Sequence, residues 1–137
     1  MEKRVIIDTD PGVDDALALM LALRSPELRV EAITTVGGNV SLDQATKNAA
    51  LILDLLSPRP EPILARGSTR PLKKGLVRSR SVHGSDGLGG LNRLIHPDGN
   101  PRYPYPHLPR DIPNATEVLL ELLKRYPDEL TLSLIHI

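Results

Sequence analysis

One stretch decides the fold that the sequence predicts: VIIDTDPGVDDAL, residues Val5–Leu17. An apolar run ends in four aspartates within eight positions, and an apolar segment of helical composition follows at once. A short apolar run of this kind, rich in β-branched residues and bounded by a turn, is typical of a buried parallel strand. The stretch therefore predicts a strand, a turn crowded with carboxylates and a helix, which together begin an α/β fold.

The rest of the chain continues the alternation of strand and helix. Ser41 and Gln44 are spaced as a capping box, and Asn114 and Pro127 mark the two ends of the last helix. We expect strands at residues 4–9, 29–36 and 62–65 and from 130 onward, and helices at residues 13–24, 41–55 and 114–126. This order predicts a single α/β domain over residues 1–137, a doubly wound, mainly parallel sheet with flanking helices and right-handed crossovers.

Two segments depart from an ordinary surface pattern. The helix expected at residues 13–24 is apolar on almost every side, which is typical of a helix enclosed within a protein. Residues 66–113 form a long stretch rich in proline and glycine. Loops of that length within a compact domain are commonly functional, so we expect this stretch to form an active-site loop region.

The composition excludes several classes of function. The chain has no cysteine, which excludes a disulfide scaffold, a thiolate metal site and a cysteine nucleophile. Lysine plus arginine balance aspartate plus glutamate at 17 each, so no overall charge attracts nucleic acid or an anionic membrane. With three tyrosines and no phenylalanine or tryptophan, surfaces for stacking bases are scarce. The charged N-terminal residues fit neither a signal peptide nor a membrane span, and we expect a cytoplasmic protein without nucleic-acid or membrane partners.

The four aspartates predict a metal site at the end of the first strand. Carboxylates in one turn repel one another, and a hard divalent cation with oxygen ligands compensates them best. The alternative is helix capping, in which Asp14 and Asp15 interact with the helix dipole at about 0.3–1 kcal/mol each. Capping leaves Asp8 and Asp10 without a role, so we favour the metal site.

Further polar residues follow the other strands. Ligands of doubly wound sheets bind beyond the carboxyl ends of the strands, where Asn39 and Arg66 follow the second and third strands. His83 and Asp86 can reach the same edge from the long loop. Three of these residues have a simpler interpretation: Asn39 is a common turn residue, a loop histidine such as His83 is commonly solvated, and Arg66 belongs with the basic residues of a solvated loop face.

These motifs carry a family resemblance. DTDPGVDDAL, residues 8–17, resembles the N-terminal signature of the inosine–uridine-preferring nucleoside hydrolases. The resemblance continues through TVGGNV at residues 35–40, NAA at 48–50, GSTRPL at 67–72 and HGSDGLG at 83–89. Several motifs in the same order make the match specific, although it covers less than half the usual length of a member.

The resemblance implies a reaction and its residues. The family hydrolyses the N-glycosidic bond of ribonucleosides to the free base and ribose with a bound Ca²⁺, through an oxocarbenium-like transition state. By analogy, Asp10 and Asp15 are the metal ligands, and Asp10 is also the catalytic residue that takes the proton from water. Asp14 and Asn39 would bind the ribose hydroxyls.

The resemblance also implies supporting roles and an assembly. Asp8 would support the metal ligands from behind, and His83 would lie on the side of the nucleobase. The partner would be a small-molecule ribonucleoside, with no nucleic acid and no membrane, and complete members are expected to form homo-oligomers.

The match ends near residue 133. Members of the family continue a strand like that at residues 130–132 into a turn resembling Gly-Pro-Leu-Thr-Asn, whereas this chain reads SLIHI at residues 133–137. We interpret these five residues as a non-native tail, the alternative being a natural strand end. The chain would then be a fragment, incomplete at the C-terminus and inactive alone, with an open sheet edge and a partly uncovered apolar helix.

Two rival functions remain open at the level of sequence. A magnesium phosphatase of the haloacid dehalogenase type also places Asp-x-Asp after its first strand, with the first aspartate, here Asp8, as the nucleophile. Such enzymes commonly continue with Gly-Thr, whereas Pro11 and Gly12 stand here. The second rival is a non-catalytic fragment that binds a metal or ribose.

Overall fold

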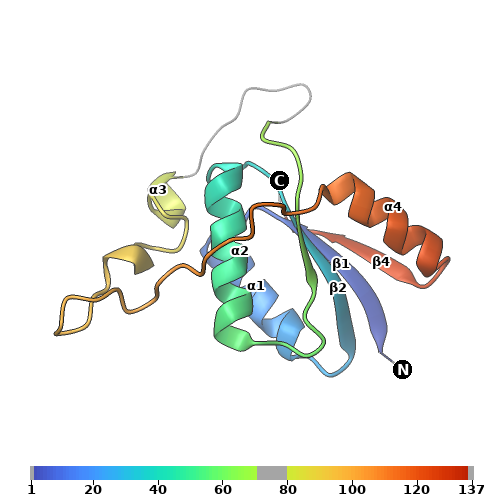
Figure 1. The fold of residues 1–137 in the computed structure, drawn as a ribbon, viewed down its shortest axis with the longest axis horizontal. Coiled ribbons are helices and arrows are strands. Elements are labelled where there is room, and N and C mark those ends of the chain that lie inside the picture. Colours follow the sequence, from blue (N-terminus) through green and yellow to red (C-terminus); the bar gives the residue numbers. More distant parts are fainter. Residues whose placement is uncertain (1, 71–79, 136–137) are drawn as a thin grey trace.

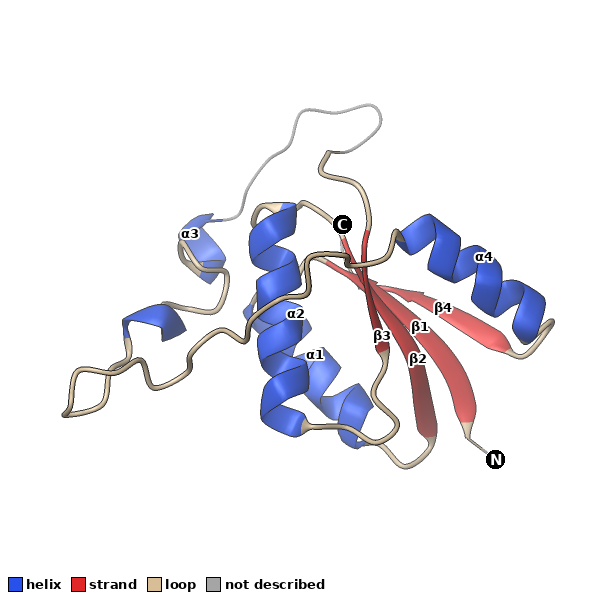
Figure 2. Ribbon diagram, in the orientation of Figure 1, coloured by secondary structure: helices blue, strands red, loops and turns tan. Residues whose placement is uncertain are grey.

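The computed structural model of the protein describes residues 2–70 and 80–135, and within them the chain forms a four-stranded parallel sheet in the order β3-β2-β1-β4 (Figures 1 and 2). Its elements are β1 (Lys3–Thr9), α1 (Val13–Arg24), β2 (Leu28–Thr35), α2 (Leu42–Leu56), β3 (Ile63–Arg66), α3 (Arg80–His83), a 3₁₀ turn (Leu91–Arg93), α4 (Ala115–Arg125) and β4 (Leu130–Leu134). The predicted doubly wound, mainly parallel sheet with flanking helices is confirmed.

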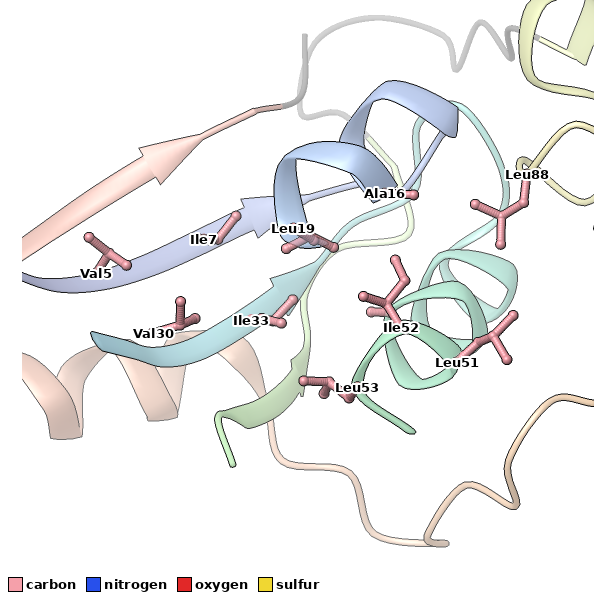
Figure 3. Close-up of a cluster of buried hydrophobic side chains, with 11 residues drawn as sticks. Val5, Ile7, Ala16, Leu19, Val30, Ile33, Leu51, Ile52, Leu53 and Leu88 are labelled. Atoms are coloured by element: carbon pink, nitrogen blue, oxygen red, sulfur yellow. The ribbon is translucent and has the colours of Figure 1, made fainter. Parts of the chain in front are cut away.

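The two faces of the sheet are covered by different helices. Side chains alternate along a strand, so Val5 and Ile7 of β1 point to one face and Ile6 to the other. The first face packs against α1 and α2, where Leu19 and Ile52 complete the core (Figure 3). Ile6 instead belongs to a smaller cluster with residues of α4. The chain thus winds outward from β1 through β2 to β3, then returns across the opposite face to place β4 beside β1.

The helix starts follow the predicted capping. Ser41 is the N-cap of α2, where its hydroxyl accepts a hydrogen bond from the Gln44 N–H at 3.3 Å. Asn114 is the N-cap of α4, and its side-chain oxygen accepts from the Thr116 N–H at 2.8 Å. Each cap satisfies a backbone donor that the first helical turn leaves without a partner.

α1 is covered on one side only, which departs from the expectation of an enclosed helix and agrees with the partly uncovered helix expected of a fragment. Leu19 is fully buried, but Leu17 and Leu21 are 63% and 75% exposed. The helix packs on the sheet and on α2 from one side, and no other element within residues 2–70 and 80–135 covers its outer side. Leu132 and Leu134 of β4 are likewise exposed, in keeping with the open edge and uncovered helix that the sequence predicts.

The long stretch at residues 66–113 is not one irregular loop. It contains α3 and the 3₁₀ turn, and its residues 71–79 lie outside the part of the chain that the structure describes. Residues 83–88 pack against the rest of the domain, whereas residues 92–102 are largely exposed. Of the described part of this region, residues 83–88 therefore lie beside the predicted site, and Tyr105 contacts α2 through Asn48.

The chain end pairs with β1 as far as the structure describes it. Ser133 and Leu134 lie opposite Ile7 and Asp8 in the β4–β1 register, and the Ile135 N–H donates to the Asp8 carbonyl oxygen at 3.1 Å. A natural strand end accounts for these contacts, while the non-native origin of residues 133–137 stays a prediction. None of the described helices is both long and apolar enough to cross a membrane.

Two leucines of α1 provide a matched test of this packing. We expect Leu19→Ala to lower the free energy of unfolding by about 2–5 kcal/mol, because it leaves a cavity between the sheet and α2. Leu21→Ala, on the exposed side of the same helix, should change it by less than about 0.5 kcal/mol. Urea unfolding followed by circular dichroism measures both, and equal losses in the two variants would contradict the packing described here.

Candidate active site

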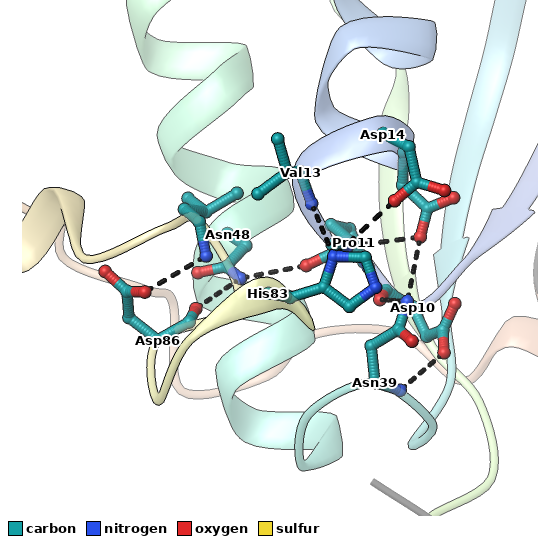
Figure 4. A network of polar contacts seen from close by, with 11 residues as sticks. Asp10, Pro11, Val13, Asp14, Asn39, Asn48, His83 and Asp86 are labelled. Carbon is teal, nitrogen blue, oxygen red and sulfur yellow. Dashed lines mark hydrogen bonds and ion pairs between the residues drawn. The ribbon is translucent and has the colours of Figure 1, made fainter. Parts of the chain in front are cut away.

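Polar residues from three segments meet at the carboxyl end of the sheet (Figure 4). The β1–α1 turn and the first turn of α1 supply Asp10, Asp14 and Asp15. The β2–α2 turn supplies Asn39, and α3 supplies His83. The sequence predicted this convergence, because parallel strands bring their carboxyl ends to one edge.

Asp10 is a buried carboxylate with one side unpaired. Its side chain is only 3% exposed, and Oδ2 accepts a hydrogen bond from the Asn39 N–H at 2.6 Å. Oδ1 is buried without a hydrogen-bond partner among the described residues. A side chain at Gly38 would place its Cβ 1.9 Å from Oδ2, so only glycine allows the β2–α2 turn to approach this carboxylate.

Asp15 combines helix capping with a second buried carboxylate. It is 4% exposed, and its Oδ2 accepts from the Gly12 N–H at 3.1 Å, which caps the start of α1. The same oxygen lies 3.4 Å from Asn39 Nδ2. Burial raises the pKa of the Asp15 carboxyl to about 6, and the negative charges of Asp10 and Asp14 add to the effect. The capping interpretation is therefore right for one oxygen of Asp15. It does not compensate the electrostatic repulsion between the buried carboxylates of Asp10 and Asp15.

His83 is placed directly over the start of α1. Its side chain is buried, so the interpretation as a solvated loop histidine is wrong. Nδ1 accepts a hydrogen bond from the Val13 N–H at 3.3 Å and lies 3.6 Å from Oδ1 of the exposed Asp14. A Cβ at Gly12 would come within 2.8 Å of the same nitrogen, so the imidazole rests on the bare glycine backbone.

Two other predicted members have different surroundings. Asp8 is the next-to-last residue of β1 and accepts a hydrogen bond from the Thr34 hydroxyl of the neighbouring strand. Arg66 ends β3 at the carboxyl edge of the sheet, as the sequence predicts, and its guanidinium forms an ion pair with Asp43 in the first turn of α2. An exposed carboxylate one element away offers the guanidinium a partner without the cost of burial.

Asp86 organises its own loop instead of joining the cluster. Its buried side chain accepts from the backbone N–H groups of Leu88, Gly90 and Asn92 at 2.9–3.1 Å. Burial alone would raise the pKa of Asp86, but these three donors outweigh it and hold the pKa below its ordinary value. Asp86 therefore lies in a loop beside the predicted site, as expected, but its carboxylate is bound by its own loop and not directed at the aspartates.

Sequence reasoning gave no role to Asn48. This fully buried amide of α2 hydrogen-bonds to Pro11 and Asp86, which lie in two different loops. The available signal is a polar residue within the stretch NAALIL, where the neighbouring positions are apolar. A buried side-chain amide needs partners for both its donors and its acceptor, so such a position indicates contacts with distant backbone.

The donors of the site suit a hard cation only in part. Asp10 and Asp15 offer carboxylate oxygens, including the unpartnered Oδ1 of Asp10, and Ca²⁺ prefers such ligands. Within residues 2–70 and 80–135, however, no group of three or more histidine, aspartate or glutamate side chains is arranged to hold a metal ion. The described residues thus offer two buried carboxylates, fewer than the roughly six to eight oxygen ligands that Ca²⁺ commonly takes.

Comparisons with known proteins point to one family. The family model for inosine-uridine preferring nucleoside hydrolase matches residues 5–135. Uridine nucleosidase 1 of Arabidopsis thaliana is 39% identical over 131 residues, 95% of this chain and 36% of that protein. The pyrimidine-specific ribonucleoside hydrolase RihA of a Shewanella strain is 39% identical over 132 residues, which are 96% of this chain and 38% of the relative.

A solved structure gives the same result. A plant nucleoside hydrolase superposes with a TM-score of 0.80 at 37% identity, covering 98% of this chain and 40% of that structure. The chain therefore spans roughly two fifths of the length of the relatives that it matches.

The raised pKa of Asp15 predicts how stability depends on pH in the absence of metal. The carboxyl holds its proton up to a pH of about 6 in the folded chain but only to about 4 when unfolded. The folded state thus binds more protons in this window, and the free energy of unfolding should fall by roughly 2–3 kcal/mol as pH rises through it. Asp15→Asn should remove this fall.

Urea unfolding at a series of pH values, in buffer containing a chelator, measures how the free energy of unfolding of the wild type and of each variant depends on pH. Asp54→Asn serves as the control, because Asp54 is an exposed aspartate near the end of α2. It should keep the wild-type pH dependence. An Asp15→Asn variant with the same pH dependence as the wild type would contradict the assignment.

Proposed function

The chain belongs to the inosine-uridine preferring nucleoside hydrolase family, and on that basis we propose that its aspartate cluster serves the hydrolysis of the N-glycosidic bond of ribonucleosides, giving the free base and ribose. One observation carries the proposal: Asp10 and Asp15 are buried together, with Oδ1 of Asp10 lacking a partner among the described residues. Two such carboxylates without a cation are costly to bury, so the arrangement favours a site for a divalent ion.

We assign the ion as Ca²⁺ and its protein ligands as Asp10 and Asp15. The hard oxygen donors support this choice over a softer metal, because the site has no thiolate and its one nearby imidazole, His83, faces the Val13 N–H. When bound, Ca²⁺ would orient the sugar hydroxyls and a water molecule and would lower the pKa of that water.

The roles of the other residues follow from their surroundings. Oδ1 of Asp10 has no competing donor, so it can accept the proton of an attacking water. Asp14 is exposed and can accept a hydrogen bond from a ribose hydroxyl. The Nδ2 contacts of Asn39, at 3.3 and 3.4 Å, are long, and its amide can turn to a second hydroxyl at little cost.

Asp8 and His83 border the aspartate cluster. Asp8 is held by the Thr34 hydroxyl two residues before Asp10, and we propose that it supports the position of the turn that carries Asp10. His83 borders the cluster on the side of α3, and we propose that it faces the nucleobase.

The family assignment weighs against the phosphatase alternative. A match over residues 5–135 includes every motif of the first two strands, and the Asn39 turn has no counterpart in the phosphatase pattern. Asp8 also lies within the β1 ladder opposite Leu134, with its carboxylate bonded to Thr34. A nucleophile needs an open approach to phosphorus, which this position does not favour.

Calcium binding tests the ligand assignment. We expect the chain to bind Ca²⁺ weakly, in about the 10⁻⁴–10⁻³ M range, because the described residues supply two carboxylates. Asp10→Asn and Asp15→Asn should each abolish the binding, whereas Asp54→Asn should leave it unchanged. Isothermal titration calorimetry gives the dissociation constants, and retained binding in both active-site variants would refute the site.

Coupling between nucleoside and Ca²⁺ tests the proposed substrate. If both bind the same cluster, inosine or uridine should tighten Ca²⁺ binding, since linkage between two ligands is reciprocal. Asp14→Asn and Asn39→Ala should remove the tightening and keep the binding of Ca²⁺ alone. Tightening by a phosphate ester in place of the nucleoside would favour phosphatase chemistry.

Activity of the chain alone is expected to be absent. Its described residues complete neither the calcium shell nor the side of the leaving base, so we expect no measurable release of ribose from inosine or uridine. A reducing-sugar assay with excess Ca²⁺ makes the measurement. Efficient, calcium-dependent release by the purified 137-residue chain would show that two carboxylates are enough.

A further inference from the structure

Asn48 is a buried amide that the proposed chemistry does not use. It lies in the middle of α2, faces the β1–α1 turn and is fully buried (Figure 4). Its two N–H donors and its carbonyl oxygen must all find hydrogen-bond partners there, because a buried polar atom without a partner lowers the free energy of unfolding.

Both donors of Asn48 reach backbone carbonyls of distant segments. Nδ2 donates to the Pro11 oxygen at 3.0 Å and to the Asp86 oxygen at 2.8 Å. Pro11 follows Asp10 directly in the turn that carries the cluster, and Asp86 lies three residues beyond His83. The side-chain amide of Asn48 thus joins the turn that carries Asp10, the proposed metal ligand, to the loop that follows His83, the proposed base-side residue.

The orientation of the amide is fixed from its other end. Oδ1 accepts from Gln44 Nε2 at 2.9 Å and from the Tyr105 hydroxyl at 3.0 Å. With two donors facing the oxygen, the opposite orientation of the amide would set donor against donor, so the nitrogen must face the two carbonyls. The helix, through Gln44, therefore determines which group points toward the loops.

The same two segments also touch directly. Gly87 has a φ of +79°, and a Cβ there would lie 2.9 Å from Asn48 Nδ2 and 3.1 Å from the Pro11 oxygen. His83 rests on Gly12 in the same way. Two close contacts that require glycine, with a shared amide between them, leave little room for one segment to move without the other.

We propose that Asn48 is a positioning residue that couples the β1–α1 turn, which carries Asp10, to residues 83–89, which begin with His83. The two sides of the active site would then move as one unit. Its effect on ligand binding rests on the proposed function, but the mechanical coupling does not. A side chain that merely filled the core would stabilise all parts of the domain alike. Asn48 instead sets the distance between two functional segments.

A pair of conservative variants separates these roles. Asn48→Asp keeps the shape and the acceptor but turns a carboxylate oxygen toward the carbonyls of Pro11 and Asp86. Tyr105→Phe removes one hydrogen bond from the acceptor side and leaves both ties to the loops. Should N48D fail to fold, Asn48→Ser, whose hydroxyl can donate only once, provides the same comparison.

Amide hydrogen exchange by NMR reports on each segment separately. The Val13 N–H, bound by His83 Nδ1, and the Gly89 N–H, bound by the His83 carbonyl, report on the two sides. Val118 in α4, on the opposite face of the sheet, is the reference. We expect N48D to lower protection at Val13 and Gly89 together by about tenfold more than at Val118. Y105F should lower all three equally or not at all.

The protection of these three amides in N48D tests the proposed coupling. A joint, local loss in N48D supports the coupling. A uniform loss at all three amides, or a loss in only one of the two segments, overturns it.

Calcium titration of the same variants tests the functional consequence. N48D should raise the dissociation constant of Ca²⁺ about tenfold relative to Y105F, because the turn that holds Asp10 is no longer fixed. If the wild-type chain binds no Ca²⁺ while N48D still loosens both segments together, the calcium assignment fails and the coupling stands. Unchanged Ca²⁺ affinity in an N48D variant with loosened segments would overturn the role of Asn48 in the site.

Discussion

The repulsion between two buried carboxylates, Asp10 and Asp15, is the constraint on which the site depends. Each is nearly excluded from water, and each accepts hydrogen bonds on one oxygen from the surrounding backbone. Those donors come from the Gly12 and Asn39 N–H groups, one at the start of α1 and one in the β2–α2 turn. Neutral donors do not remove a charge, and the pKa of Asp15 stays raised, chiefly because of burial and further because of the negative charges of Asp10 and Asp14.

The local backbone is shaped around this pair. Gly38 lets the β2–α2 turn approach Asp10, and Gly12 both caps α1 through Asp15 and provides the surface on which His83 rests. Because β1 and β2 are adjacent and parallel, their turns meet at the same edge, where α1 also directs its N-terminal dipole. The fold thus concentrates donors where the carboxylates need them, and a divalent cation would complete the compensation.

The sequence predicted the elements better than their surroundings. Every predicted helix and every strand before residue 130 lies within one residue of its observed bounds, since local signals such as the Ser41 cap and the apolar run of β1 depend on neighbouring residues. The aspartates and Asn39 were placed correctly for the same reason, together with the geometry of parallel sheets. The failures concern contacts across the chain. They include the ion pair between Arg66 and Asp43, the hydrogen bonds of Asp86 within its loop and those of Asn48 to two distant segments. These contacts depend on distances in the folded chain that no local sequence pattern encodes.

The most direct measurement is a crystal structure of the chain grown with CaCl₂, with the ion identified by anomalous scattering. We expect a Ca²⁺ ion at about 2.3–2.6 Å from Oδ1 of Asp10 and from an oxygen of Asp15, with water molecules in the remaining positions. Two carboxyl groups sharing a proton, with no ion bound between them at saturating Ca²⁺, would contradict this expectation.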